Sequence, residues 1–201
     1  METVVCPQLF PVKTNMHHPF LFRGVTASFH LANEGLLRPK SQGPFTYAFH
    51  WGEPGHLWGS GALWGSTPTN AVIRHQLNQE GFPTSGISTT PHIERATVYA
   101  RGKDGNGNGF VFKIIRSELE RHGITEFVVA QFCQPSVPED DEVILVVSGS
   151  SCLPSTVVAE VIPIAPQPMY SNGVSPARVK VVVASVMQPT VDYRDCPNTS
   201  L

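Results

Sequence analysis

Short apolar runs separated by proline, glycine and polar residues recur along the chain, and their spacing predicts a mixture of strands and helices. Irregular sequence punctuated by prolines fills residues 1–19. The run Phe-Leu-Phe-Arg-Gly-Val at 20–25 then predicts a first strand. Ser28 is placed to cap a short helix that reaches Asn33 and stops at Gly35.

Two longer helices are expected next. Thr67 suits the N-cap of a helix over 69–80, with a proline in its first turn. A short strand then leads into Ser88, and the second helix is expected at about 91–101.

Strands dominate the rest of the chain. They are expected at 110–115, 125–132 and 142–148, followed by further apolar runs at 157–162 and 178–186. Helices early in the chain, followed by clustered strands, predict an α+β fold with compact sheets.

The stretch 43–68 sets Trp51, Trp58 and Trp64 among glycines and prolines, which predicts a long ordered loop. One interpretation is a lid over the core. The other is an aromatic wall for a substrate.

Composition narrows the class of protein. The 201 residues are 41% hydrophobic and 15% charged, which is typical of one globular domain with its own core. The net charge of −2, with no basic block, gives no support for capture of nucleic acid or of an anionic membrane. No signal-peptide pattern is visible, and no run approaches the roughly 18 apolar residues of a membrane span. A soluble protein without a membrane partner is therefore expected.

Neither cysteines nor histidines form a metal-binding pattern. No CxxC pair and no HExxH motif occur, so no metal site is expected. The spacing of the four cysteines permits disulfides without requiring them, and free thiols are the favoured interpretation.

Four consecutive acidic residues, Glu139 to Glu142, lie between a proline and an apolar run. One interpretation is a solvated acidic turn. The other is chemical, because cleavage of an N-glycosidic bond to ribose develops positive charge that a fixed carboxylate stabilises. In an extended segment, residues two apart share a face. Glu142 can then act on the ribose while Asp140 receives the incoming nucleophile.

Arg23 lies in the apolar first strand, where a guanidinium needs an anion. The partner of this guanidinium is either a structural carboxylate or a phosphate or ribose of NAD. Gly24 allows a ligand to approach the backbone closely. Ser88, Thr89 and Thr90 end a strand before a helix, where they can cap the helix or brace a carboxylate. Thr90 can do the first while Ser88 does the second.

In this order, the segments Phe22-Arg23-Gly24 and Ser88-Thr89-Thr90, together with Glu142, resemble the ADP-ribosyltransferases with an Arg–Ser–Glu triad, the class typified by cholera toxin. Residues 27–39 and 96–100 look like the helical segments that follow the first two motifs in that family. The resemblance covers about residues 20–150. It implies an ADP-ribosyltransferase-like fold with split, antiparallel-rich sheets flanked by helices, and NAD as the substrate, with no metal.

The resemblance also implies a role for each motif residue. Arg23 anchors NAD, Gly24 admits the nicotinamide amide, Ser88 orients Glu142, and Glu142 stabilises the ribosyl cation. Thr89 and Thr90 complete the NAD-binding element. Tyr99, Phe110 and Phe112 are candidates for the ring that stacks on nicotinamide, although core packing fits each of them better.

The acceptor is implied by Asp140. Members that modify arginine carry glutamate two residues before the catalytic glutamate, and this chain has an aspartate there, one methylene shorter. The loop at about 133–141 would recognise the acceptor. A protein arginine is therefore expected in preference to a nucleic acid.

Together these features predict a mono-ADP-ribosyltransferase that releases nicotinamide from NAD, with its catalytic domain at 20–165 and a C-terminal extension at 166–201 that holds one further strand. Toxin-like members of the class are often secreted or delivered into another cell as effectors. Two alternatives stay open. One is an NAD glycohydrolase that uses water as acceptor. The other is a non-enzymatic β-rich binding module whose tryptophan loop recognises a partner.

Overall fold

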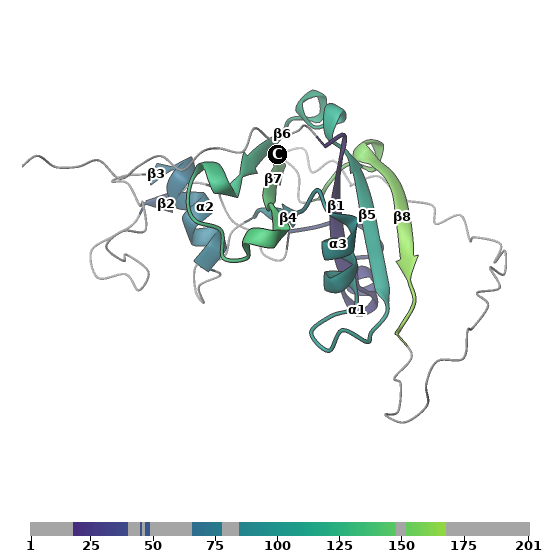
Figure 1. Cartoon of the computed structure of the whole chain (residues 1–201). Coiled ribbons are helices and arrows are strands. Elements are labelled where there is room, and N and C mark those ends of the chain that lie inside the picture. Colours follow the sequence, from purple (N-terminus) through teal and green to yellow (C-terminus); the bar gives the residue numbers. More distant parts are fainter. Residues whose placement is uncertain are drawn as a thin grey trace, which may run out of the picture.

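A computed structural model describes residues 18–39, 45, 47–48, 66–77, 85–147 and 152–167, and the fold within them is α+β, as predicted. Two small antiparallel sheets carry it (Figure 1). The first has the strand order β1-β5-β8, from Phe20–Thr26, Gly109–Ile115 and Val158–Ile164. The second has the order β4-β7-β6, from Ile87–Thr89, Val143–Val147 and Ile124–Val128.

Three α-helices and several single turns of 3-10 helix flank these sheets in the described part of the chain. The α-helices are α1 (Ala27–Ala32), α2 (Pro68–Leu77) and α3 (Ile93–Ala100). The 3-10 turns are η1 (Arg116–Glu118), η2 (Glu120–His122), η3 (Val129–Gln131), η4 (Pro138–Asp140) and η5 (Ser155–Val157). The short strands β2 (Tyr47–Ala48) and β3 (Ser66–Thr67) pair with each other before α2.

The main core lies between the two three-stranded sheets. In β1, Leu21 and Val25 point into it, where they join Ile87 of β4 and Leu145 of β7. Phe22 points the other way, toward α3, as the two-residue repeat of a strand requires. Arg23 shares the inner face with Leu21 and Val25.

A backbone bridge joins β1 of the first sheet to the residue that follows β4 of the second. Phe22 N–H donates to Thr90 O at 2.7 Å, and Thr90 N–H donates to Phe22 O at 2.9 Å. The bridge therefore brings Arg23, the next residue of β1, close to the end of β4.

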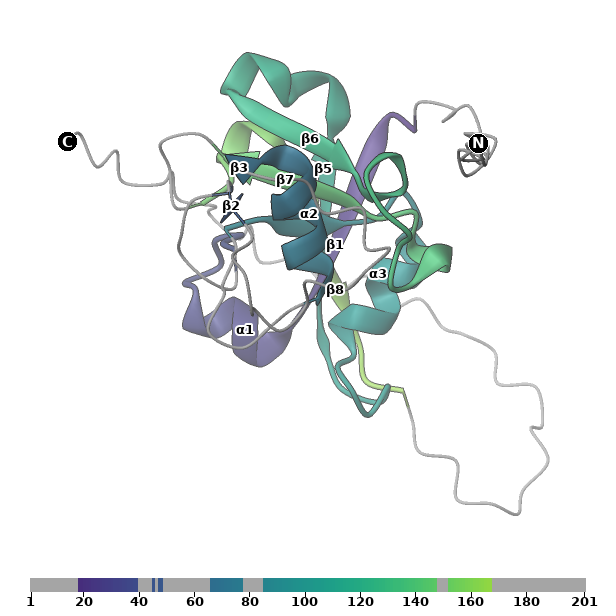
Figure 2. The ribbon, with the colours of Figure 1, turned by 90° about the vertical axis from the view of Figure 1, so that its left-hand side faces the viewer.

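Helix α2 covers the opposite face of the second sheet. Its Ala71 and Val72 are fully buried and pack with Ile144 of β7 and Phe127 of β6. Figure 2 shows α2 lying over this sheet. Polar residues on the same face of α2 consequently lie toward Ser88 of β4 and toward Glu142, which directly precedes β7.

Local capping agrees with the sequence at one helix and differs at another. Thr67 Oγ1 accepts the N–H of Asn70 at 3.1 Å, which confirms the predicted cap of α2. The predicted cap at Ser28 is wrong. Thr26, the extended last residue of β1, is the N-cap of α1, and its Oγ1 accepts the N–H of Phe29 at 3.3 Å.

The strand expected at 125–132 is shorter than predicted. It pairs with β7 only as far as Val128, opposite Val143, and then turns into η3. Strand β7 in turn begins at Val143 and not at Glu142, because Asp141 has a left-handed backbone conformation with φ of 43°. Pairing cannot continue past that residue.

Some predictions concern residues that the structure does not describe, and one concerns the cysteines. The three tryptophans of the predicted loop and the run at 178–186 lie outside the described residues. The preference for free thiols holds for Cys133 but is wrong for Cys152, which is disulfide-bonded to a partner outside the described residues.

Candidate active site

Arg23 forms a hydrogen bond with a backbone carbonyl, although a carboxylate or a ligand was expected as its partner. Its Nη1 donates to Ser88 O at 2.9 Å across the junction of the two sheets. Burial lowers the pKa of the Arg23 guanidinium, and the negative charge of Glu142 offsets part of that shift. Arg23 is thus held in place by one hydrogen bond, with further donors on the guanidinium.

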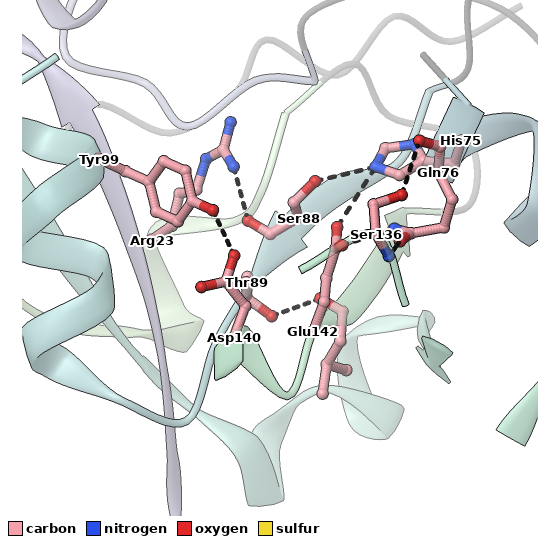
Figure 3. Close-up of polar contacts among 10 residues, drawn as sticks. Arg23, His75, Gln76, Ser88, Thr89, Tyr99, Ser136, Asp140 and Glu142 are labelled. Carbon is pink, nitrogen blue, oxygen red and sulfur yellow. Dashed lines mark hydrogen bonds and ion pairs between the residues drawn. The ribbon is translucent and has the colours of Figure 1, made fainter. Parts of the chain in front are cut away.

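Glu142 directly precedes β7 and faces α2. Its Oε2 accepts a hydrogen bond from Gln76 Nε2 at 2.6 Å, and its Oε1 lies 3.7 Å from His75 Nε2 (Figure 3). The Glu142 side chain is 16% exposed. The carboxylate is therefore oriented by a neutral amide and keeps a limited opening to solvent.

Gln76 is itself held in place by Ser136, through both its side chain and its backbone. Its side-chain oxygen accepts the backbone N–H of Ser136 at 2.9 Å, and its backbone oxygen accepts Ser136 Oγ at 3.2 Å. Because the amide oxygen is taken by an N–H donor, the amide nitrogen must face Glu142. Helix α2 thereby connects the glutamate with the loop ahead of η4.

Ser88 reaches Glu142 only through a histidine. Its Oγ lies 2.9 Å from His75 Nε2, the same nitrogen that faces Glu142 (Figure 3). Ser88 pairs with Ile144 in the sheet and so shares the face that α2 covers. His75 thus lies between Ser88 and Glu142, and the predicted bracing of Glu142 by Ser88 stays a prediction.

The side chains of the two threonines after Ser88 form hydrogen bonds with backbone atoms of the protein. The buried Thr89 donates from Oγ1 to Val143 O at 2.6 Å, which ties β4 to β7. Thr90 Oγ1 accepts the N–H of His92 at 3.1 Å, so its hydroxyl caps the turn that leads into α3. The predicted capping of the helix by Thr90 is therefore wrong, because the N-cap of α3 is His92, without a side-chain cap hydrogen bond.

The backbone at Gly24 is closely approached by α3. A Cβ placed on Gly24 would lie 1.8 Å from Ala96 O and 2.8 Å from Ala100 N. The glycine is therefore required for helix packing. Its predicted role toward nicotinamide stays a prediction.

The expectation that Asp140 and Glu142 share a face is wrong. Asp140 ends η4, and the left-handed Asp141 rotates the chain before Glu142. Asp140 consequently turns toward α3, where Arg95 Nε donates to Oδ1 at 2.6 Å and the hydroxyl of Tyr99 donates to Oδ2. Figure 3 shows Asp140 and Glu142 directed toward different partners.

The three aromatic residues that were candidates for stacking on nicotinamide all have partners within the protein. Phe112 is fully buried in the core, and Phe110 stacks on His30 with ring centroids 4.0 Å apart. Tyr99 is committed to Asp140 through its hydroxyl. Core packing is confirmed for Phe112.

Sequence reasoning missed His75 and Gln76. A signal was present, because they lie four residues after the buried Ala71 and Val72 and so continue the stripe of α2 that faces the sheet. Within the described ranges, no three His, Cys, Asp or Glu side chains gather as a metal site. No helix in that part of the chain is long and apolar enough to cross a membrane.

Two small antiparallel sheets that meet beside Arg23, with Ser88 on the second sheet and Glu142 directly before its strand β7, are consistent with an ADP-ribosyltransferase-like fold. The comparison with family models identifies the relatives. The model of NarE matches residues 20–145, so the chain belongs to the NarE family, a neisserial ADP-ribosyltransferase-like family. The protein is therefore of the ADP-ribosyltransferase class. Neither a curated protein nor a solved structure matches the chain.

Proposed function

We propose that this protein is a mono-ADP-ribosyltransferase of the Arg–Ser–Glu type that moves ADP-ribose from NAD to a guanidino group of an acceptor protein. The observation that carries the proposal is the Glu142 carboxylate, which Gln76 orients at 2.6 Å and whose charge acts on Arg23. Membership of the NarE family supports the reaction class.

Each side chain of the site has a task in this reaction. Arg23 binds the anionic pyrophosphate through the donors that Ser88 O leaves available. Glu142 stabilises the positive charge that develops on the ribose as its bond to nicotinamide lengthens. Gln76 and His75 hold that carboxylate in one orientation, which lowers the cost of reorganisation during the reaction.

The bond changes balance without a further reactant. The bond between ribose C1′ and the nicotinamide nitrogen breaks, and its electron pair leaves with neutral nicotinamide. A guanidino nitrogen of the acceptor then forms a bond to C1′ and releases one proton to solvent. An acid two residues before Glu142 supports a guanidinium acceptor, because Asp140 can bind and orient one.

A second candidate function is NAD hydrolysis, in which water takes the place of the acceptor. One observation favours it, since both carboxylate oxygens of Asp140 are already bonded to Arg95 and Tyr99. If Asp140→Ala retains NAD cleavage and the wild-type protein never labels an acceptor, hydrolysis is the natural reaction.

The proposed function is tested by transfer of labelled ADP-ribose to protein acceptors in Glu142→Gln. The substitution preserves shape and removes the charge, so we expect transfer to fall by at least about 100-fold while NAD binding survives. Transfer by this variant at the wild-type rate would contradict the assignment of Glu142.

A further inference from the structure

The carboxylate that the proposed function assigns to the acceptor is already occupied by an arginine of the same chain. Asp140 is largely buried, with 9% of its side chain exposed. Arg95 Nε donates to its Oδ1 at 2.6 Å, and Tyr99 donates from its hydroxyl to Oδ2. Each carboxylate oxygen therefore has a strong donor.

Both donors come from one face of α3. Arg95 and Tyr99 are four residues apart, which places them together on the helix surface. Burial and the hydrogen bond to Asp140 raise the pKa of Tyr99 to about 12, so its phenol keeps the proton that it donates. The hydrogen bond and the charge of Asp140 raise the pKa of Arg95. The three groups form a charge-balanced cluster at neutral pH.

Arg95 has the chemistry of the acceptor that Asp140 is expected to bind. It presents a guanidinium to the carboxylate, and because only 9% of the Asp140 side chain is exposed, a second guanidinium has to displace Arg95 to reach it. The Arg95 side chain is 33% exposed, so it can leave toward solvent. Exchange of one guanidinium for another preserves the charge balance around Asp140.

We propose that Arg95 is an internal mimic of the acceptor, which competes with an incoming guanidino group for Asp140 and thereby directs part of the reaction to water. This inference rests on the proposed function. While Arg95 holds Asp140, the ribosyl cation made from NAD is captured by water, which bonds to C1′ and loses a proton. When Arg95 is displaced, the acceptor guanidino nitrogen forms that bond instead.

The test measures how the ADP-ribosyl group is divided between a guanidino acceptor and water. Purified full-length protein is incubated with NAD and agmatine, a small guanidino acceptor, and ADP-ribosyl-agmatine is divided by total nicotinamide released. In Arg95→Gln, which keeps a polar side chain of similar length without the guanidinium, we expect this ratio to rise by about threefold to tenfold, because a partly exposed ion pair contributes only weakly to an equilibrium. The ratio is independent of how much protein is correctly folded.

Two further variants make the test specific. Tyr99→Phe removes the other donor to Asp140 but leaves Arg95 in place, so its ratio should stay within about twofold of wild type. Arg95→Lys keeps the charge but loses the planar fork, so its ratio should lie between wild type and Arg95→Gln.

The outcomes separate the two proposals. The order wild type, Arg95→Lys, Arg95→Gln supports the acceptor mimic. Transfer to agmatine by the wild-type protein, with an unchanged or lower ratio in Arg95→Gln, leaves the proposed function standing and overturns the role of Arg95. NAD cleavage without ADP-ribosyl-agmatine in any variant overturns both and favours hydrolysis. Absence of nicotinamide release from every variant overturns both.

Discussion

At the scale of single residues, the two carboxylates of the acidic run are held by opposite kinds of partner. Glu142 receives a neutral amide from Gln76, whereas Asp140 receives the cationic Arg95. A neutral donor orients a carboxylate without cancelling its charge, so the Glu142 charge stays available for a developing cation. A cationic partner stabilises the carboxylate but neutralises the field that it exerts. This contrast separates a group suited to catalysis from one suited to recognition.

Substitution of Gln76 tests this contrast. Gln76→Met keeps the length of the side chain and removes the donor, so we expect nicotinamide release to fall about tenfold, which corresponds to loss of one hydrogen bond to a charged group. Gln76→Glu places a second carboxylate against the first, so one of the two retains its proton to higher pH. The acidic limb of the pH–rate profile should therefore move to higher pH in that variant.

Ser136→Ala is the matched control for Gln76. It removes the hydroxyl contact with the Gln76 carbonyl but keeps the backbone N–H that fixes the Gln76 amide. Its rate should stay near that of the wild type. A Gln76→Met enzyme as fast as Ser136→Ala would show that Gln76 does not orient Glu142.

At the scale of elements, glycines allow α3 and its neighbours to approach closely. A Cβ on Gly24 of β1 would meet Ala96 O of α3, and one on Gly109 of β5 would meet Ala100 O at 2.2 Å. Both obstacles are backbone atoms, which cannot rotate away as a side chain can. The close packing of α3 on the first sheet thus depends on Gly24 and Gly109. The position of Arg95, which lies on α3, depends on them as well.

Gly24→Ala is therefore expected to destabilise the fold by about 3 kcal/mol or more, because helix and sheet must move apart. Gly105→Ala provides the comparison. That glycine has φ of 69° and nothing within 4 Å, so only backbone strain of about 1 kcal/mol opposes the alanine. Chemical denaturation measures both free energies of unfolding. Equal losses in the two variants would contradict the tight packing at Gly24.

The sequence predicted most of these elements because their signals are local. The apolar run of β1 and the Thr67 cap of α2 were both readable from neighbouring residues. The direction of Asp140 was not, because one left-handed residue, Asp141, reverses the alternation expected of a strand. The partners of Glu142 were not predicted either, since His75 and Gln76 meet it only after α2 packs on the second sheet.

At the scale of the whole molecule, the candidate site combines residues from both sheets. Arg23 belongs to the first sheet, Ser88 belongs to the second, and Glu142 directly precedes β7 of the second. The Phe22–Thr90 bridge brings the two sheets together. The NarE match at 20–145 includes all of these positions. Strand β8 lies beyond the match and completes the first sheet by pairing with β5. The motifs come together because Arg23 lies within β1 next to the bridge, Ser88 lies near the end of β4, and Glu142 directly precedes β7.

Binding of NAD across this junction should stabilise the entire domain. In Glu142→Gln, which we expect to bind NAD without cleaving it, NAD at about 100 times its Kd adds about 2.7 kcal/mol and should raise Tm by roughly 5–10 °C. Adding Arg23→Lys should remove most of this shift, because lysine lacks the fork that binds phosphate.

Arg121→Ala in the same background is the control, since Arg121 pairs with Glu118 on an exposed surface. It should retain the full NAD-induced shift. Loss of the shift in both double variants, or its absence throughout, would argue against NAD binding at Arg23.

Release of nicotinamide from NAD by the purified protein, measured beside Glu142→Ala, tests the central claim most directly. We predict steady release by the wild-type protein, with or without an acceptor, and loss of at least about 100-fold in the variant. Release that is equal in the two proteins would remove Glu142 from the reaction. No release from the wild-type protein, even with cell lysate as a source of acceptors, would contradict the assignment of NAD chemistry to this fold.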